Sequence, residues 1–180
     1  MSVKEIKWST DEKVDKNIIN GVEKLWNIAF PRQYVDIVSN HNSSVPEVKN
    51  EDGEWKSGII NIPNWSSRSA SFRLLSYNKS KYSDTPVIVA TNEIFKDSVP
   101  DTSKIFAFAQ DGAGNLLLFD YRKSSEPSIV FIDHEQSRSE DDLSDFELEE
   151  KSVEEWLEDN LYPVCNSFEE LIDRIYPDFD

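Results

Sequence analysis

The chain has 180 residues, of which 38% are hydrophobic and 12% aromatic, and its formal net charge is −16 at neutral pH. A chain of this length fits one domain that buries roughly 70% of its unfolded surface. The negative charge argues against a nucleic-acid-binding protein and against binding to an anionic membrane, because both kinds of partner attract Lys and Arg. No apolar run approaches the ~20 residues of a membrane span.

The N-terminal residues and the cysteine content bear on the cellular compartment. Residues 1–8 contain no apolar stretch of the kind found in a secretory signal peptide. The single cysteine, Cys165, excludes an internal disulfide framework. Both features fit a cytoplasmic protein, and we predict that location.

Two helices are predicted in the N-terminal part of the chain. Residues 9–12 (Ser-Thr-Asp-Glu) have the spacing of a helix-capping box, which is expected to begin the first helix. Its buried stripe has apolar residues at helical spacing, namely Val14, Ile18, Val22 and Leu25. Pro31 is expected to open the second helix, which the polar run 40–44 ends. The buried face of this second helix comprises Tyr34, Ile37 and Val38.

Residues 43–71 are polar and irregular in sequence, and the only strand predicted there is a short one at Ile59–Ile62. Trp55 and Trp65 lie in this segment, and we expect one of them to be a core residue. Another strand is predicted at Phe72–Leu75. The apolar run Val87–Ala90 then precedes a short predicted helix over residues 91–97.

Three apolar runs predict an antiparallel meander, with strands at Ile105–Ala109, Leu116–Tyr121 and Ile129–Ile132. Gly112 and Gly114 separate the first two runs, where a reversing chain needs positive φ or close backbone approach. Asp111 or Asn115 is expected to bond the local backbone in an Asx-type turn. The second and third runs are apolar on both faces, which predicts central strands covered on both sides.

The C-terminal part is predicted to begin with an acidic loop over residues 136–151 and to continue with two helices. Ser152 and Ser167 each start a capping-box pattern, and Pro163 and Pro177 are expected to stop the two helices. The buried face of the last helix comprises Phe168, Leu171, Ile172 and Ile175. Helices at both ends with strands between them predict an α+β fold. We expect a single domain over residues 1–180, with helices packed on a mostly antiparallel central sheet.

Catalytic and metal-binding patterns are weak in this sequence. The run Asp133-His134-Glu135 follows a predicted strand, but one histidine with scattered carboxylates lacks a metal-ligand spacing such as H-E-x-x-H. Cys165 is expected to be a buried, unreactive thiol. We therefore predict no enzyme activity, no cofactor and no metal site. The alternative is a small hydrolase in which Asp111, Asp120 and His134 converge in one pocket.

Four segments, taken in order, resemble a known family. They are residues 30–34 (FPRQY), 41–46 (HNSSVP), 108–135 (with FAQDGAGNLLLFDYR and IVFIDHE) and 166–171 (NSFEEL). Together they are similar to the SUKH superfamily of immunity-protein and cell-wall-assembly-regulator-like domains, over roughly residues 14–176. Ser43-Ser44 departs from the family pattern, which has a glycine pair there, and a different turn is expected at this point.

The resemblance implies a non-enzymatic immunity protein that binds and neutralises a cognate bacterial toxin, such as a nuclease. Residues 140–159 contain eleven acidic residues and one base, Lys151, so we expect the toxin domain to be basic. The predicted partner-binding residues are this cluster and the acid at its entrance: Glu135, Glu140, Asp141, Asp142, Asp145, Glu147, Glu149 and Glu150. Two alternatives remain: a regulatory scaffold of the same superfamily without a toxin, or an acidic stretch that only solubilises the protein.

Overall fold

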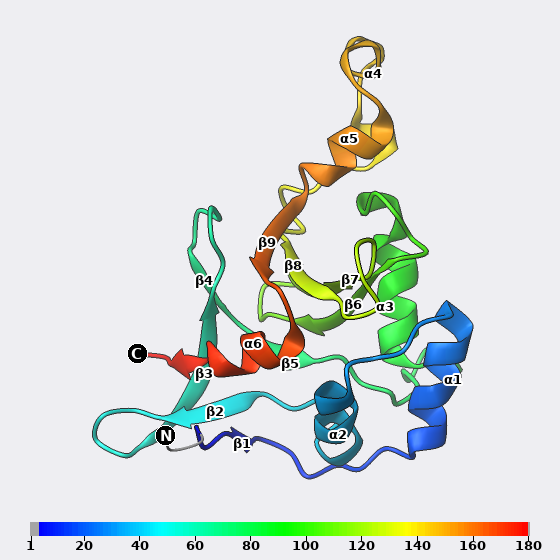
Figure 1. Ribbon diagram of the computed structural model, residues 1–180. Helices are drawn as coiled ribbons and strands as arrows, with labels where there is room; N and C mark the ends of the chain where they lie inside the picture. The colour runs from blue at the N-terminus through cyan, green and yellow to red at the C-terminus, as the bar shows by residue number, and fades with distance from the viewer. Residues whose placement is uncertain (1–3, 180) are drawn as a thin grey trace.

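Two antiparallel sheets organise the chain in the computed structural model, which describes residues 4–179 (Figure 1). The first sheet contains β1 (Lys7–Trp8), β2 (Pro46–Lys49), β3 (Trp55–Asn61), β4 (Ser69–Ser71) and β10 (Tyr176–Pro177). The second contains, in spatial order, β5 (Arg73–Leu74), β6 (Ile105–Gln110), β7 (Leu116–Asp120), β8 (Ser128–Ile132) and β9 (Leu161–Cys165). The predicted α+β class is confirmed, and the strands form two sheets.

The helices lie before, between and after the strands of these sheets. They are α1 (Lys16–Trp26), α2 (Arg32–Asn40), α3 (Val87–Phe95), α4 (Asp145–Glu150), α5 (Val153–Glu158) and α6 (Phe168–Asp173), with 3-10 turns η1 (Lys96–Ser98) and η2 (Glu140–Asp142). Among residues 4–179, none of these helices has the length and apolar character needed to cross a bilayer.

The predicted meander is confirmed as β6, β7 and β8, which pair in sequence order. All five residues of β7 are buried, so both of its faces are covered as expected. The turn between β6 and β7 is the predicted Asx type, because Asp111 Oδ1 accepts hydrogen bonds from the backbone N–H groups of Ala113 (2.9 Å) and Asn115 (2.8 Å). Gly114 has the positive φ, +97°, that this turn requires.

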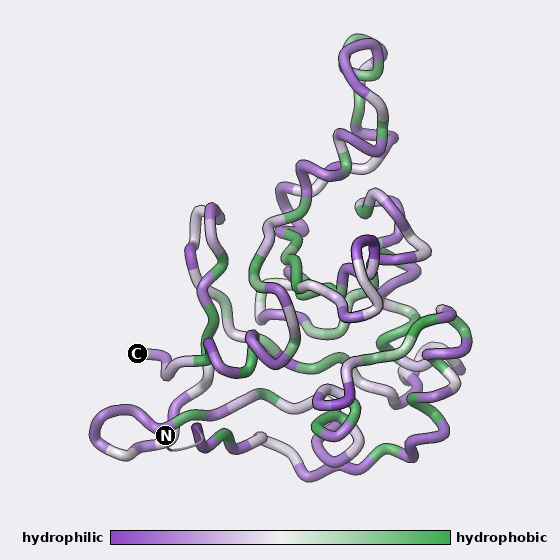
Figure 2. Tube along the Cα trace, viewed as in Figure 1, coloured by the Kyte–Doolittle hydropathy of each residue, from purple (hydrophilic) through white to green (hydrophobic). Residues whose placement is uncertain are grey.

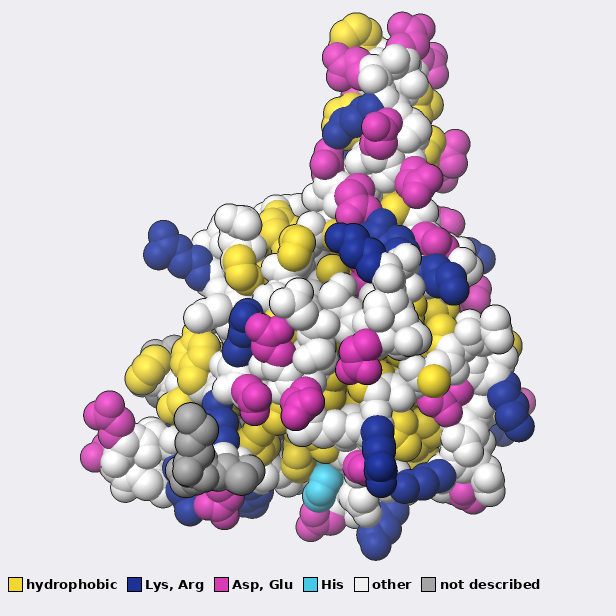
Figure 3. Space-filling view, viewed as in Figure 1, with side chains coloured by type: hydrophobic (Ala, Val, Ile, Leu, Met, Phe, Trp, Pro, Cys, Tyr) yellow, Lys and Arg dark blue, Asp and Glu magenta, His cyan; other side chains and the backbone are white. Residues whose placement is uncertain are grey.

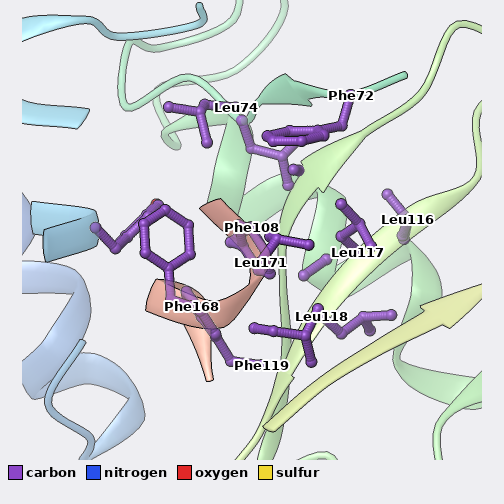
Figure 4. Close-up of a cluster of buried hydrophobic side chains, with 14 of the residues drawn as sticks. Phe72, Leu74, Phe108, Leu116, Leu117, Leu118, Phe119, Phe168 and Leu171 are labelled. Atoms are coloured by element: carbon purple, nitrogen blue, oxygen red, sulfur yellow. The ribbon is translucent and has the colours of Figure 1, made fainter. Parts of the chain in front are cut away.

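Aromatic side chains from α2 and α6 cover one face of the meander (Figure 4). The rings of Phe108 and Phe119 are stacked with centroids 4.0 Å apart. Tyr34 of α2 and Phe168 of α6 meet the Phe119 ring edge-on, at 5.2 and 6.0 Å. Phe168, Leu171 and Ile172 are buried, which confirms the predicted face of the last helix. Ile175 is also buried, but the helix ends before it, at Asp173, and Pro177, which was expected to stop the helix, lies in β10.

Trp65 is the core tryptophan of the pair that the sequence left undecided. Its ring lies 4.6 Å from that of Phe131, and its Nε1–H donates to the buried Asp133 carboxylate at 2.8 Å. The side chain thereby fastens the loop between β3 and β4 to the end of β8. Trp55 is only half-buried on β3, where the Lys49 ammonium lies 4.8 Å from its ring centroid.

The predicted start of the first helix is wrong. Ser9 follows β1, and its Oγ accepts a hydrogen bond from the Val45 backbone N–H at 3.0 Å. Asp15 is the true N-cap, so α1 begins after the residues proposed as its capping box. The predicted stripe is also wrong in part, because Ile18 and Leu25 are exposed while Ile19 and Val22 are buried.

Three further boundaries differ from the sequence-based expectation. Residues 43–71 are not irregular, since β2, β3 and β4 lie there. Helix α3 begins at Val87 and includes the whole apolar run before residue 91. The helix expected to reach Pro163 ends at Glu158 as α5, and Pro163 lies in β9, an edge strand that tolerates a residue without an N–H.

Ser43 occupies the left-handed region, with φ of 56°, where the resembling family has glycine. Glycine adopts this conformation without the steric penalty that a Cβ brings, and this gain is larger than the additional entropy that glycine loses on folding. Ser43→Gly is therefore expected to raise the free energy of unfolding by about 0.5 kcal/mol. Ser44 is fully buried, and its Oγ accepts from the Thr10 backbone N–H at 2.9 Å. Ser44→Ala is therefore expected to lose about 1–2 kcal/mol. Urea unfolding of both variants measures whether the free energy of unfolding rises in Ser43→Gly and falls in Ser44→Ala.

An acidic arm as the candidate partner-binding site

Residues 136–160, here called the acidic arm, leave the body of the protein between β8 and β9 (Figure 1). The arm contains η2, α4 and α5 and stands away from both sheets. Acidic side chains cover much of its visible face (Figure 3). The prediction of a loop over residues 136–151 is wrong, because η2 and α4 lie there and each has its own capping box.

Hydrogen bonds and ion pairs at its base join the arm to η1 and to the end of β7. The buried Asn160 side chain donates to the carbonyl oxygens of Ser98 (2.8 Å) and Arg138 (2.7 Å) and accepts from the Arg138 backbone N–H (2.9 Å). Arg122 binds both Asp120, at the end of β7, and Glu158 of α5. These two carboxylates raise the pKa of the Arg122 guanidinium, which stays charged between the body and the arm.

Trp156 of α5 is the centre of the arm's own packing. Its Nε1–H donates to the carbonyl oxygen of Glu147 at 2.9 Å, which ties α5 to α4. The Lys151 ammonium lies 4.0 Å from the ring centroid and the Arg138 guanidinium carbon 5.6 Å from it. Cation–π attraction of this kind holds both bases against the ring while their charges offset part of the arm's acidity.

Glu147 is committed to the arm's internal structure. Its carboxylate receives both Nη groups of Arg138, at 2.9 and 3.0 Å, and both the N–H (2.9 Å) and the Oγ–H (2.7 Å) of Ser144. These hydrogen bonds, the guanidinium first, lower the pKa of Glu147 to about 2. The carboxylate is therefore ionised at neutral pH and already paired with Arg138 and Ser144, so its charge is committed inside the arm.

Asp142 has a similar internal role, because its Oδ2 accepts from the N–H (2.7 Å) and the Oγ–H (2.9 Å) of Ser139. These bonds lower the pKa of Asp142. Within the described residues, no side-chain hydrogen bond or ion pair is found for the other predicted contact residues, all exposed: Glu135, Glu140, Asp141, Asp145, Glu149 and Glu150. Glu135 lies at the base of the arm, directly after β8, and the other five lie between η2 and the end of α4.

The sequence interpretation missed the residues that build the arm. Ser144 and Glu147 fit the same Ser-x-x-Glu pattern that identified the α5 cap, so the start of α4 could have been found. Arg138 and Asn160 carry no sequence pattern of their own, and the helical spacing that includes Trp156 predicts its place on a helix but not its contacts. Their roles depend on contacts between η2, α4 and α5 that only the folded arm creates.

The residues proposed for a hydrolase do not converge. Asp111 precedes β7 and Asp120 ends it, so the two carboxylates lie at opposite ends of this strand. His134 lies near the Asp111 end, with its Nδ1 2.9 Å from Asn115 Oδ1. No group of three or more His, Cys, Asp or Glu side chains among residues 4–179 is arranged to hold a metal ion. Burial raises the pKa of the half-buried Cys165 thiol to about 11, which disfavours the reactive thiolate.

Comparison with known families agrees with the resemblance seen in the sequence. The family model described as SMI1 / KNR4 family (SUKH-1) matches residues 13–174. The match covers the strands β2 to β9, the acidic arm and α6, and it leaves out the short strands β1 and β10. No curated protein sequence matches the chain.

Proposed function

The chain belongs to the SMI1 / KNR4 family (SUKH-1), and from this premise we propose that it is an immunity protein that binds and neutralises a cognate protein toxin. It acts in the cytoplasm without catalysing a reaction, by covering a surface that the toxin needs. The observation that carries the proposal is the acidic arm, which projects from the body (Figure 3). Six of its carboxylates have no side-chain hydrogen bond or ion pair within residues 4–179, namely those of Glu140, Asp141, Asp145, Glu149, Glu150 and Glu154.

Electrostatics supports a basic toxin domain, such as a nuclease, as the partner. A nuclease binds phosphates through Lys and Arg, so its groove attracts a dense group of carboxylates. Residues 140–159 carry a net charge of −10, while the rest of the chain carries −6. Because the arm stands away from the sheets, its carboxylates can approach a groove closely enough for attraction over a Debye length of about 8 Å at physiological salt.

Charge reversal of the arm tests the proposal. We expect the cognate toxin domain to be encoded by a neighbouring gene. The triple variant Asp141→Lys, Glu149→Lys and Glu150→Lys is expected to slow association with this toxin domain at least about 10-fold at low salt. It leaves Asp142 and Glu147, which hold the arm together, unchanged. Stopped-flow or biosensor kinetics at two salt concentrations measures the effect, and survival of toxin-expressing cells reports protection.

The matched control reverses the same number of charges on the body. Glu51→Lys, Asp52→Lys and Glu169→Lys alter exposed acids outside the arm and change the net charge equally. We expect this variant to slow association less than about 3-fold. Equal effects of the two triple variants would refute a specific role of the arm. Binding of several unrelated cellular proteins, with no affinity for the neighbouring toxin, would favour the regulatory scaffold.

A further inference from the structure

We propose that Phe146, on α4 in the outer part of the acidic arm, is an apolar anchor that inserts into an apolar pocket on the basic surface of the toxin domain. This inference rests on the proposed function and adds an apolar contact to the charge attraction described above. Phe146 is 69% exposed, and Leu148 on the same helix is 38% exposed. At the arm's outer end the trace passes through hydrophobic residues between hydrophilic ones (Figure 2), and hydrophobic side chains lie among the acidic ones (Figure 3).

The packing of α4 explains why Phe146 is left uncovered. The helix is held to the rest of the arm through Glu147, whose carboxylate binds Arg138 and whose carbonyl accepts from Trp156. Neighbouring residues on a helix point about 100° apart, so Phe146 cannot share the inward direction of Glu147. An exposed Phe therefore stays in solvent although its burial would be favourable by roughly 1.5–3 kcal/mol in a packed site.

The charges around Phe146 identify the kind of partner that can bury it. Glu149 and Glu150 follow at i+3 and i+4, which places their carboxylates on the same side of α4 as the Phe146 ring. Neither carboxylate has a hydrogen-bond or ion-pair partner within residues 4–179. A complementary surface has an apolar pocket with Lys or Arg at its rim. A second copy of this chain, with a net charge of −16, and an anionic membrane both lack that charge.

The two chemistries are expected to act on different rate constants. Long-range charge attraction speeds encounter, whereas a buried aromatic anchor slows dissociation. Aromatic side chains are enriched among the few interface residues that dominate affinity, and they are surrounded by polar contacts that exclude water. Phe146 among the arm's carboxylates has this arrangement, so it is expected to set the lifetime of the complex.

The experiment compares Phe146→Ala with Ile94→Ala, which truncates another exposed apolar side chain, 75% exposed, on α3. Binding of each full-length variant to the neighbouring toxin domain is measured by biosensor kinetics. Phe146→Ala is expected to raise the dissociation rate about 30-fold and to leave the association rate within about 2-fold. Ile94→Ala is expected to change neither rate. Circular dichroism verifies that both variants are folded.

A synthetic peptide provides a probe that does not depend on the toxin. A peptide of alternating Lys and Leu is expected to bind the wild-type protein about 10-fold more tightly than a matched Lys–Ser peptide, and Phe146→Ala removes this preference. Toxin binding that is unaffected by Phe146→Ala overturns the anchor and leaves the proposed function intact. Phe146-dependent binding of the Lys–Leu peptide without toxin binding refutes the proposed function and the toxin as the occupant, and it shows that Phe146 anchors a basic partner of another kind. Binding of neither probe overturns the anchor.

Discussion

Replacing Phe119 by alanine is expected to lower the free energy of unfolding by about 3–5 kcal/mol, which is the range for a fully buried Phe. Phe119 is the last residue but one of β7, the central strand of its sheet, and is 0% exposed. Its ring is stacked on Phe108 at 4.0 Å and meets Tyr34 at 5.2 Å and Phe168 at 6.0 Å. The cavity left by the substitution would be shared by β6, β7, α2 and α6, and no single element can relax to fill it.

Urea unfolding followed by tryptophan fluorescence measures this loss, with Phe146→Ala as the matched control. The control removes the same atoms from a side chain that is 69% exposed, and we expect its free energy of unfolding to stay within about 0.5 kcal/mol of wild type. A loss below about 1.5 kcal/mol for Phe119→Ala would contradict the central place of this ring in the core.

The parts of the fold that the sequence predicts well are those whose partners are close in the chain. β6, β7 and β8 are apolar runs joined by short turns, so each strand pairs with the next one along the chain. The last helix was also predicted, because the Ser167 cap and the apolar spacing from Phe168 to Ile175 are local. The meander and the last helix can therefore be predicted from local sequence without reference to the rest of the fold.

The sequence-based predictions fail where a residue forms hydrogen bonds or strand pairs with residues that are distant in the sequence. Glu12 was expected to cap a helix, but its two carboxylate oxygens accept from the side chains of Asn42 (3.1 Å) and Asn78 (2.7 Å). The first sheet was missed because β3 pairs with β10 as well as with β2 and β4. One strand partner lies more than a hundred residues away, and no local pattern encodes that pairing.

The candidate site was located by charge alone, and its internal organisation could not be. The acidic residues of the arm look alike in sequence, yet Asp142 is paired with serine and Glu147 with serine and arginine, while Glu149 and Glu150 have no side-chain partner in the described part of the chain. The carboxylates at the capping positions form hydrogen bonds inside the arm, and these positions depend on where η2 and α4 begin. The structure therefore separates residues that hold the arm together from residues that can meet a partner.

Trp156→Ala is expected to unfold the acidic arm while the two sheets stay folded. The substitution removes the hydrogen bond to the Glu147 carbonyl and the ring that holds Lys151 and Arg138. One hydrogen bond contributes about 1 kcal/mol and each partly exposed cation–π contact about 0.5–1 kcal/mol. The substitution is therefore expected to remove roughly 2–3 kcal/mol of stability from the arm. Helices α4 and α5 cannot stay folded without these contacts, since both are far shorter than the ~12 residues at which isolated helices become stable.

Hydrogen exchange measures the effect residue by residue. Amides of α4 and α5 are expected to exchange at least about 30-fold faster in Trp156→Ala, because 1.4 kcal/mol is tenfold in an equilibrium constant, while amides of β6 to β8 keep their protection. Trp156→Phe keeps a smaller aromatic ring and loses the Nε1 donor, so its exchange rates in α4 and α5 are expected to lie between those of the wild type and of Trp156→Ala. Trp55→Ala removes another lysine-contacting indole, on β3, and should leave the arm unchanged. Unchanged exchange in α4 and α5 of Trp156→Ala would show that the arm is held by Glu147 and Arg138 alone, and toxin affinity would then be insensitive to Trp156.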